Sequence, residues 1–448
     1  MKGIGWGAAL AALALGMGTA PRAGAQETDR TALEQRVQEL EQELALLKRK
    51  IEVDDEAAAS KGPQPVLSAG SDGFTLRSAD SSYQLKLRGY TQFDSRWFTD
   101  TNNYGPGADT FYFRRIRPIF EGTLANFIDF RIMPDFANSQ LVIQDAWANL
   151  RFLPEAQLMF GKFKGPVGLE RLQSAPALWF VERALPTNLV PNRDLGVIAQ
   201  GVAREGLFTY QVGWMNGVTD GGSADTDANN DKDVVARVFV HPFQESDLGP
   251  LQGLGVGFAT TYGHELGTPG SYKTSGQQTF FQFAAGTTQT GTRTRYAPQA
   301  YWYWGPFGLL AEYVYDTAQF ARPGVPDIRA NNSAWQIAGA WAITGENEAY
   351  KGLLPSAGFS PGNGHWGALE LAARFSQLKV DNNVFANGYA NPATQAESAS
   401  LWSVGLNWYL NRNMKLMFNY DETSFRNFDG NANRPDEGVF LTEFQLSY

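Results

Sequence analysis

The sequence predicts an all-β transmembrane protein: an antiparallel barrel of about sixteen strands with an inward-folded loop, preceded by a short helical coiled coil. Two observations predict the barrel. Long segments alternate between apolar and polar side chains, as in residues 83–97, which is the pattern of a strand with one face toward lipid and one toward water. The connections between such segments include both short turns and long polar loops, as in barrels with turns on one rim and loops on the other.

The first 25 residues predict a secretory signal peptide. Lys2 precedes an apolar run at residues 4–17, and the small residues Ala23, Gly24 and Ala25 favour cleavage before Gln26. No later segment approaches the ~18 uninterrupted apolar residues of a membrane helix, which argues against a helical membrane protein. We therefore expect an exported chain whose membrane segments are strands.

Residues 26–53 predict a parallel coiled coil on the periplasmic side. Arg36 would face Glu41 of a neighbouring helix, and Glu43 would face Lys48, so both pairs attract in register. The alternative is a solvated amphipathic helix that lies on the barrel. The seam positions recur at alternating spacings of four and three: Leu33, Val37, Leu40, Leu44, Leu47 and Ile51.

Residues 54–72 predict a linker, and residues 73–448 the barrel domain. The linker has an acidic cluster, an Ala-rich patch and two prolines, Pro63 and Pro65. The span 83–448 accommodates about sixteen strands at ~20–25 residues per strand and connection. The chain ends on Phe444, Leu446 and Tyr448 in alternation, similar to the signal that outer-membrane barrels present to their assembly machinery, so this machinery and outer-membrane lipid are expected partners.

Composition excludes several other classes. The chain has no cysteine and therefore no disulfide framework. It holds 37 Lys and Arg against 46 Asp and Glu, and without Lys2 and Arg22 its net charge is −11, which argues against a nucleic-acid partner. Residues 225–233 imitate a calcium loop, but Asn230 and Ala236 occupy the positions of the required Gly and Glu. We expect no metal and no cofactor.

Residues 160–196 combine features that point to a loop inside the barrel. Four prolines, at positions 166, 176, 186 and 191, exclude one long strand or helix. Apolar residues such as Trp179 and Phe180 need cover, whereas basic residues such as Arg171 and Arg183 need water or anions. A loop folded back into a polar lumen satisfies both requirements.

The amino-acid sequence of this loop resembles that of the phosphate-selective porin O and P family. The resemblance lies in residues 161–170, 180–185 and 192–197, and continues in family order at Arg114-Arg-Ile-Arg117, Asp145-Ala-Trp147, residues 213–217, 343–346, 367–374 and 405–409. It covers roughly Tyr83 to the C-terminus. It implies sixteen strands, the bacterial outer membrane, a homotrimer, and passive diffusion of small hydrophilic solutes with a preference for anions such as phosphate.

Candidate pore-lining residues follow from the polar faces of the strands and from the loop. Arginine forks suit phosphate, and lysine acts as a point charge. Arg114 has the opposite parity to its basic neighbours, which places it near a rim or in a bulge. The family resemblance carries over best to Arg171 and Arg183. The candidates are Lys86, Arg88, Arg115, Arg117, Arg131 and Arg237 on strands, and Lys164, Arg171, Arg183 and Arg193 on the loop.

Two alternatives stay open at this stage. The protein is a general porin without selectivity, or it is a tether in which the coiled coil acts and the barrel is only an anchor. An enzyme is not expected, because the three histidines, His241, His264 and His365, are far apart and lack any neighbouring catalytic or ligand spacing.

Overall fold

The computed structural model describes residues 25–60, 64–99, 107–227, 229–428 and 434–448, with the side chains of 25–34 and 54–60 outside this description. The chain divides into two compact units, Met1–Gln64 and Pro65–Tyr448. The expected signal peptide lies outside the described residues except for Ala25. Within the described part, no helix has both the length and the hydropathy needed to cross a bilayer.

The N-terminal unit contains one continuous helix, α1 (Ala25–Ser60). The helix continues seven residues beyond the expected end at residue 53, because Glu56 and three consecutive alanines are good helix formers. The described seam residues Val37, Leu40 and Leu44 are exposed along this single helix. The coiled coil therefore stays a prediction.

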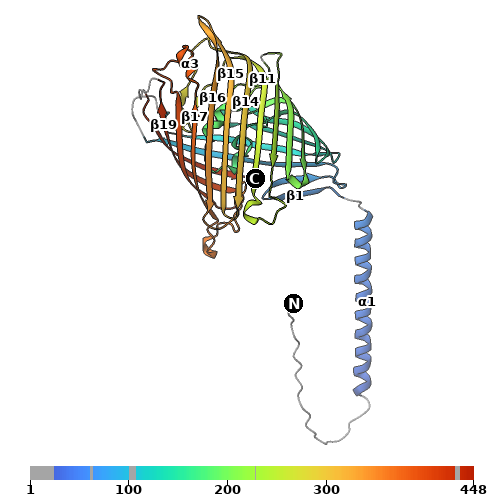
Figure 1. Ribbon diagram of the computed structural model, residues 1–448. Coiled ribbons are helices and arrows are strands. Elements are labelled where there is room, and N and C mark those ends of the chain that lie inside the picture. Colours follow the sequence, from blue (N-terminus) through green and yellow to red (C-terminus); the bar gives the residue numbers. More distant parts are fainter. Residues whose placement is uncertain (1–24, 61–63, 100–106, 228, 429–433) are drawn as a thin grey trace. The chain divides into compact units, whose positions relative to one another are not determined.

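The second unit is a closed barrel of sixteen antiparallel strands, as predicted (Figure 1). Each strand pairs with the next, and β20 pairs with β3 from Val439 opposite Phe98 to Ser447 opposite Tyr90, which closes the sheet. The strands are β3 (Gln84–Phe98), β4 (Thr110–Leu124), β5 (Ile128–Asp135), β6 (Val142–Leu153), β7 (Ala156–Phe163), β8 (Asp194–Ala203), β9 (Phe208–Met215), β10 (Asp233–Val240), β11 (Leu254–Gly267), β14 (Thr288–Trp304), β15 (Phe307–Arg322), β16 (Val325–Ala342), β17 (Ala368–Lys379), β18 (Ser398–Tyr409), β19 (Met414–Arg426) and β20 (Glu437–Ser447).

The expected linker is wrong at residues 66–70, which form a strand. Strands β1 (Val66–Gly70) and β2 (Gly73–Arg77) make a hairpin, and β2 pairs with the first residues of β3. Because β20 reaches only the second part of β3, this hairpin covers an edge that would otherwise present unpaired backbone groups. Gly73 has a positive φ of 101°, and a Cβ there would lie 2.3 Å from the carbonyl oxygen of Leu87.

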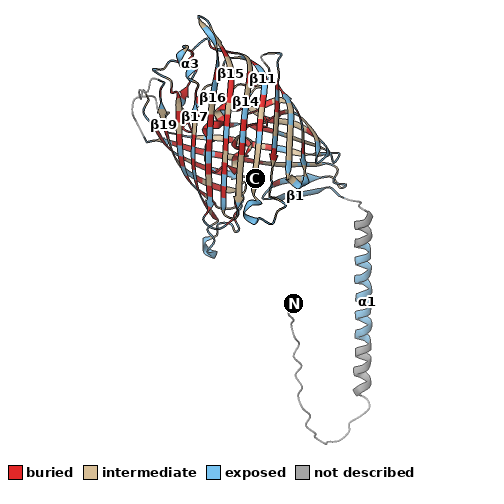
Figure 2. Cartoon of the chain, in the orientation of Figure 1, coloured by how far each residue is buried: buried red, intermediate tan, exposed pale blue. Residues whose placement is uncertain are grey.

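The two faces of the wall differ as the alternation predicts. On β3, Gln92 and Asp94 are buried, whereas Phe93 and Trp97 are exposed on the outside. Buried and exposed residues alternate in the same way along the other strands (Figure 2). The outer face is therefore apolar, and the inner face carries the charges.

The connections at the two rims differ in length. Most turns at one rim, here called the short-turn end, are brief, such as residues 305–306 between β14 and β15. One exception there is residues 343–367, which contain the 3₁₀ turn η6 (Pro361–Asn363). At the opposite rim, the long-loop end, residues 164–193, 216–232, 268–287 and 380–397 connect strands. Short 3₁₀ turns also lie at η1 (Ala137–Ser139), η4 (Arg204–Gly206) and η5 (Gly249–Leu251).

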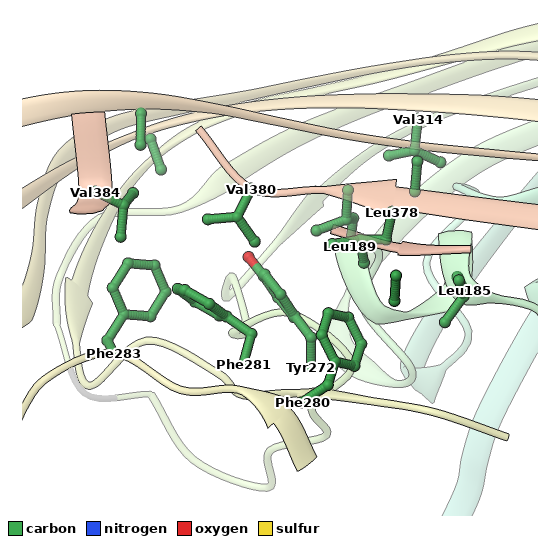
Figure 3. Close-up of a cluster of buried hydrophobic side chains, with 14 of the residues drawn as sticks. Leu185, Leu189, Tyr272, Phe280, Phe281, Phe283, Val314, Leu378, Val380 and Val384 are labelled. Atoms are coloured by element: carbon green, nitrogen blue, oxygen red, sulfur yellow. The ribbon is translucent and has the colours of Figure 1, made fainter. Parts of the chain in front are cut away.

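Three connections from the long-loop end meet in a buried apolar cluster (Figure 3). The first is residues 164–193, here called the constriction loop, which contain α2 (Leu169–Leu172), η2 (Ala175–Ala177) and η3 (Leu185–Leu189). The second carries the hairpin β12 (Tyr272–Lys273) and β13 (Thr279–Phe281), and the third carries α3 (Asn382–Ala386). Leu189, Phe280 and Val384 are each fully buried in this cluster.

Ile337 on β16 tests the assignment of the outer face. It is 51% exposed and lies on the outer face between Trp335 and Trp341. Ile337→Arg should lower the free energy of unfolding by about 2–4 kcal/mol, because a charge would then face the hydrocarbon. Ile337→Leu should cost less than about 1.5 kcal/mol. Urea titration in lipid vesicles measures both, and equal stabilities of the two variants would contradict a lipid-facing β16.

Candidate functional site

A bulge in β4 turns three neighbouring arginines toward the lumen. Gln92 of β3 pairs with Arg115, but Phe93 pairs with Phe113, so Arg114 is an extra residue in the ladder. Its guanidinium binds the carboxylate of Glu182 in the constriction loop, with Nε to Oε1 at 2.6 Å. Of the two places predicted for Arg114, near a rim or in a bulge, the structure shows the bulge. Arg114 is a lumen residue that the list of candidates omitted.

The start of the constriction loop is fixed by one carboxyl group on the wall. The N–H of Leu169 donates to Oε2 of Glu312 at 2.5 Å, and the N–H of Glu170 donates to Oε1 at 3.4 Å. Gln336 of the neighbouring strand donates to the same carboxyl group at 2.6 Å. Glu170 in turn accepts from the N–H of Ala184 at 2.8 Å, which ties the two halves of the loop together.

The connection 343–367 holds the same loop from the short-turn end. The hydroxyl of Tyr350 donates to the carbonyl oxygen of Leu169 at 2.6 Å. Gln173 donates to the carbonyl oxygen of Tyr350 at 2.9 Å, and the indole N–H of Trp179 donates to Glu348 at 3.3 Å. The constriction loop is thus bonded to structure from both rims.

Side chains of β17, β18 and β19 supply partners for the backbone of the constriction loop. Lys415 donates to the carbonyl oxygen of Leu178 at 2.7 Å, and Asn407 donates to that of Trp179 at 2.9 Å. Asn419 accepts from the N–H of Val181 at 2.8 Å. These hydrogen bonds hold the loop against β18 and β19. An open volume is left beside another part of the wall, β3 to β7.

That volume is a cavity of about 740 Å³. Among the described residues that line it, ten are basic and four are acidic. The basic residues are Arg88, Arg114, Arg115, Arg117, Arg131, Lys164, Arg171, Arg183, Arg193 and Lys273, and the acidic ones are Asp135, Asp145, Glu182 and Asp220. The local charge is therefore strongly positive in a chain whose net charge is negative.

Eight of the ten candidate residues lie in this one cavity. Lys86 does not, because it lies nearer the short-turn end, opposite Glu121 on β4 and Thr75 on β2. Arg237 does not either, since it lies on β10, where it donates to Gln299 at 3.1 Å. Their role in binding a solute stays a prediction for all ten.

Sequence reasoning also missed basic residues on the inner face of β14 and β17. Arg293, Arg295 and Arg374 are buried and lie within 4 Å of carboxylates. The alternation Thr-Arg-Thr-Arg at residues 292–295 was the available signal for the first two. Their carboxylate partners, such as Asp316 for Arg293, make them structural ion pairs of the wall.

Nine of the ten cations that line the cavity, all except the exposed Lys273, fall into two groups. The first group is paired with carboxylates: Arg117 with Asp135 at 2.7 Å, Arg193 with Asp145 at 3.0 Å, Arg114 with Glu182 at 2.6 Å, and Arg88 and Arg131 with Glu121 at 2.5 and 2.7 Å. Four carboxylates offset most of the charge of these five arginines, since Arg88 and Arg131 share Glu121. The arginines are therefore anchors for the wall and the loop.

The second group is Arg115, Lys164, Arg171 and Arg183. Among the described residues, no carboxylate lies within ion-pair distance of any of these four cations. Arg115 donates to Gln92 at 2.7 Å. The other three donate mainly to backbone carbonyl oxygens: Lys164 to Gln173 at 2.8 Å, Arg171 to Thr187 at 2.6 Å, and Arg183 to Gln173 at 2.8 Å. Neutral acceptors fix the positions of these four groups without cancelling their charge, so each still attracts an anion.

Lys164 differs from the three arginines of this group in its pKa. Withdrawal from water lowers the pKa of Lys164 well below its ordinary value, and the guanidinium groups of Arg183 and Arg193 lower it further. Arginine stays protonated at any physiological pH. Of the four, Lys164 is therefore the first to lose its proton as the pH rises.

The described residues contain no group of three His, Asp or Glu side chains placed to hold a metal ion. The polar groups of the cavity are fixed donors and ion pairs. Such a lining can attract, orient and release a charged solute in water.

A closed sixteen-stranded barrel with an apolar outer face and a charged lumen narrowed by an inward loop defines an outer-membrane porin, a channel for small solutes in the bacterial outer membrane. The model of one porin family, described as phosphate-selective porin O and P, matches residues 85–446. The chain belongs to this family.

Individual relatives agree with this assignment. The chain is 24% identical to Porin O of Pseudomonas aeruginosa over 408 residues, which cover 84% of this chain and 91% of that protein. The outer membrane channel DcaP of Acinetobacter baumannii has a similar fold, with a TM-score of 0.55 and 13% identity over 83% of this chain and 99% of that one. The trimer form of OmpT of Vibrio cholerae gives a TM-score of 0.50 and 11% identity over 82% and 100% of the two chains.

Glu312 tests how the loop is held. In Glu312→Ala the N–H groups of Leu169 and Glu170 lose their acceptor, and each lost hydrogen bond is worth about 0.5–1.5 kcal/mol. Single-channel recordings should then show a noisier open current, because the constriction loop moves more. Glu312→Gln keeps one acceptor oxygen and should give an intermediate record. An alanine variant as quiet as the unmodified porin would show that the loop does not depend on Glu312.

Proposed function

We propose that this porin conducts small anions, phosphate among them, in preference to cations. The observation that carries the proposal is the group of four cations without a carboxylate partner, Arg115, Lys164, Arg171 and Arg183, around a single cavity. The family description, phosphate-selective porin O and P, supports it independently. Passage is passive, since a water-filled lumen needs no energy source.

The chemistry of selection is the exchange of hydration water for fixed donors. An anion that enters the cavity gives up part of its hydration shell and gains charge-assisted hydrogen bonds from guanidinium forks and an ammonium group. Neutral acceptors already fix these donors in position, so little further conformational entropy is lost when the anion binds. The anion leaves again because several such sites share it and none encloses it.

The acidity of the whole chain does not oppose this preference. A pore selects by the potential at its narrow part, where field lines from nearby charges are focused by the low-dielectric wall. Acidic residues elsewhere act through water and salt, which screen them over about 10 Å at 0.1 M. The ten basic and four acidic side chains around the described cavity therefore outweigh the overall charge.

Charge removal in the loop tests the proposal. Arg171→Gln and Arg183→Gln keep length and hydrogen-bonding capacity but lose the charge, so the reversal potential in a potassium chloride gradient should move toward cation preference. One charge acting through water at ~4 Å is worth about 1 kcal/mol, roughly fivefold in the permeability ratio.

The matched control is Arg412→Gln, because Arg412 is exposed in a short turn and does not line the cavity. It should leave the reversal potential unchanged. Cation preference of the unmodified porin would exclude selective anion passage. A reversal potential near zero, with no block of chloride current by phosphate, would favour the general, non-selective porin instead.

We also propose that the porin is a homotrimer whose N-terminal helices form a parallel coiled coil in the periplasm after removal of a signal peptide at residues 1–25. The exposed seam Val37, Leu40, Leu44, Leu47 and Ile51 supports the association of helices. Three heptads are marginal alone, so the barrels must bring the helices together.

At the C-terminus, Phe444, Leu446 and Tyr448 are each at least 37% exposed on the outer face, which suits contact with lipid and with the assembly machinery.

Substitution of two seam leucines tests the proposed coiled coil. Leu40→Asp with Leu47→Asp places charges in the proposed interface and should lower the temperature at which trimers dissociate on unheated gels. Leu46→Asp is the matched control, because Leu46 is 71% exposed and lies off the seam. Equal effects of the seam variant and the control, or no effect of either, would reject the coiled coil.

A further inference from the structure

The same cavity has an apolar section that an inorganic anion does not need. Trp147 on β6 and Met159 on β7 line it and are half-buried. Two other apolar lining residues, Ile119 and Met133, are almost fully buried in one cluster with Ala175 of the constriction loop. Val142 and Leu172 also line the cavity and are half-buried. Trp147 and Met159 differ from these in that they lie on neighbouring strands and pack against the same apolar cluster.

A glycine lets β7 lie close to β6 beside the indole. Gly161 pairs with Trp147 across the strands and follows Met159 on the inner face of β7. It has a positive φ of 122°, and a Cβ there would lie 2.2 Å from the carbonyl oxygen of Ala146 and 2.8 Å from the Cα of Trp147. The inner wall thus carries no side chain beside the indole, between Met159 and Phe163.

The positive charge nearest to Trp147 is largely offset by carboxylates. The guanidinium of Arg131 lies 5.4 Å from the centre of the Trp147 ring, but Glu121 binds it at 2.7 Å. Bare phosphate placed here would lose hydration beside apolar groups and gain little in return. A carbon framework would instead gain contact with the indole and the thioether, because apolar surface leaves water.

We propose that the cavity binds organic phosphate monoesters more tightly than inorganic phosphate. The phosphoryl oxygens are held by Arg115, Lys164, Arg171 and Arg183, and the apolar or aromatic body lies against Trp147 and Met159. A volume of about 740 Å³ falls within the ~300–1,000 Å³ typical of sites for organic ligands. This inference rests on the proposed anion preference and adds the class of solute.

The test compares two monoesters that differ only in their body. Full-length porin in a planar bilayer carries a chloride current, and methyl phosphate, phenyl phosphate and inorganic phosphate are added in turn. Phenyl phosphate should give half-maximal block at a concentration about tenfold lower than methyl phosphate, and methyl phosphate should block much as inorganic phosphate does. In Trp147→Gln and in Met159→Gln the ratio between the two esters should fall to about twofold or less.

The ratio of the two half-maximal blocking concentrations is measured within one variant. It therefore does not depend on changes in that variant's conductance or in how well it inserts into the bilayer. Met414→Gln is the matched control: Met414 is a half-buried methionine on β19 outside the cavity lining, and its ratio should equal that of the unmodified porin. Equal block by both esters in the unmodified porin, or a tenfold ratio that survives both the Trp147 and the Met159 substitution, would overturn the inference. Such results would leave anion preference intact, because the reversal potential reports that preference separately.

Discussion

The structure depends on how a loop inside a membrane barrel satisfies its backbone. A chain folded into the lumen carries N–H and C=O groups that cost free energy when buried without partners. Here the wall supplies these partners: Glu312 accepts from the start of α2, Lys415 and Asn407 donate to carbonyl oxygens further along, and Asn419 accepts an N–H. The polar inner face of the strands is thus the scaffold of the constriction loop as well as the lining of a pore.

Docking on one wall makes the lumen asymmetric, and the asymmetry creates the site. The loop bonds to side chains of β17 to β19. The open volume lies along β3 to β7, where the bulge at Arg114 adds a basic side chain. Loop and wall then contribute cations to the same space. Those with carboxylate partners keep the parts together, and those with neutral partners keep their charge available.

The connection 343–367 ties the narrow part of the channel to the short-turn rim. Tyr350 and Glu348 bond to the constriction loop from below, while the apolar cluster around Phe280 and Val384 packs against Leu189 of the same loop from the other side. The loop is thus fixed between two rims. A cavity held in this way keeps its shape as solutes pass, which selection by fixed donors requires.

Sequence alone determined a barrel of about sixteen strands, their inner and outer faces and the inward loop, because a period of two and the chemistry of proline are local properties. It indicated an irregular place for Arg114 but left a rim and a bulge both open. Eight of the ten candidate residues lie in one cavity, and their role in binding a solute stays a prediction. Tertiary structure decided that residues 66–70 pair as a strand, that Lys86 and Arg237 lie outside the cavity, and which cations meet a carboxylate. The physical reason is distance along the chain: Arg114 finds Glu182 and Leu169 finds Glu312 only after the barrel has closed.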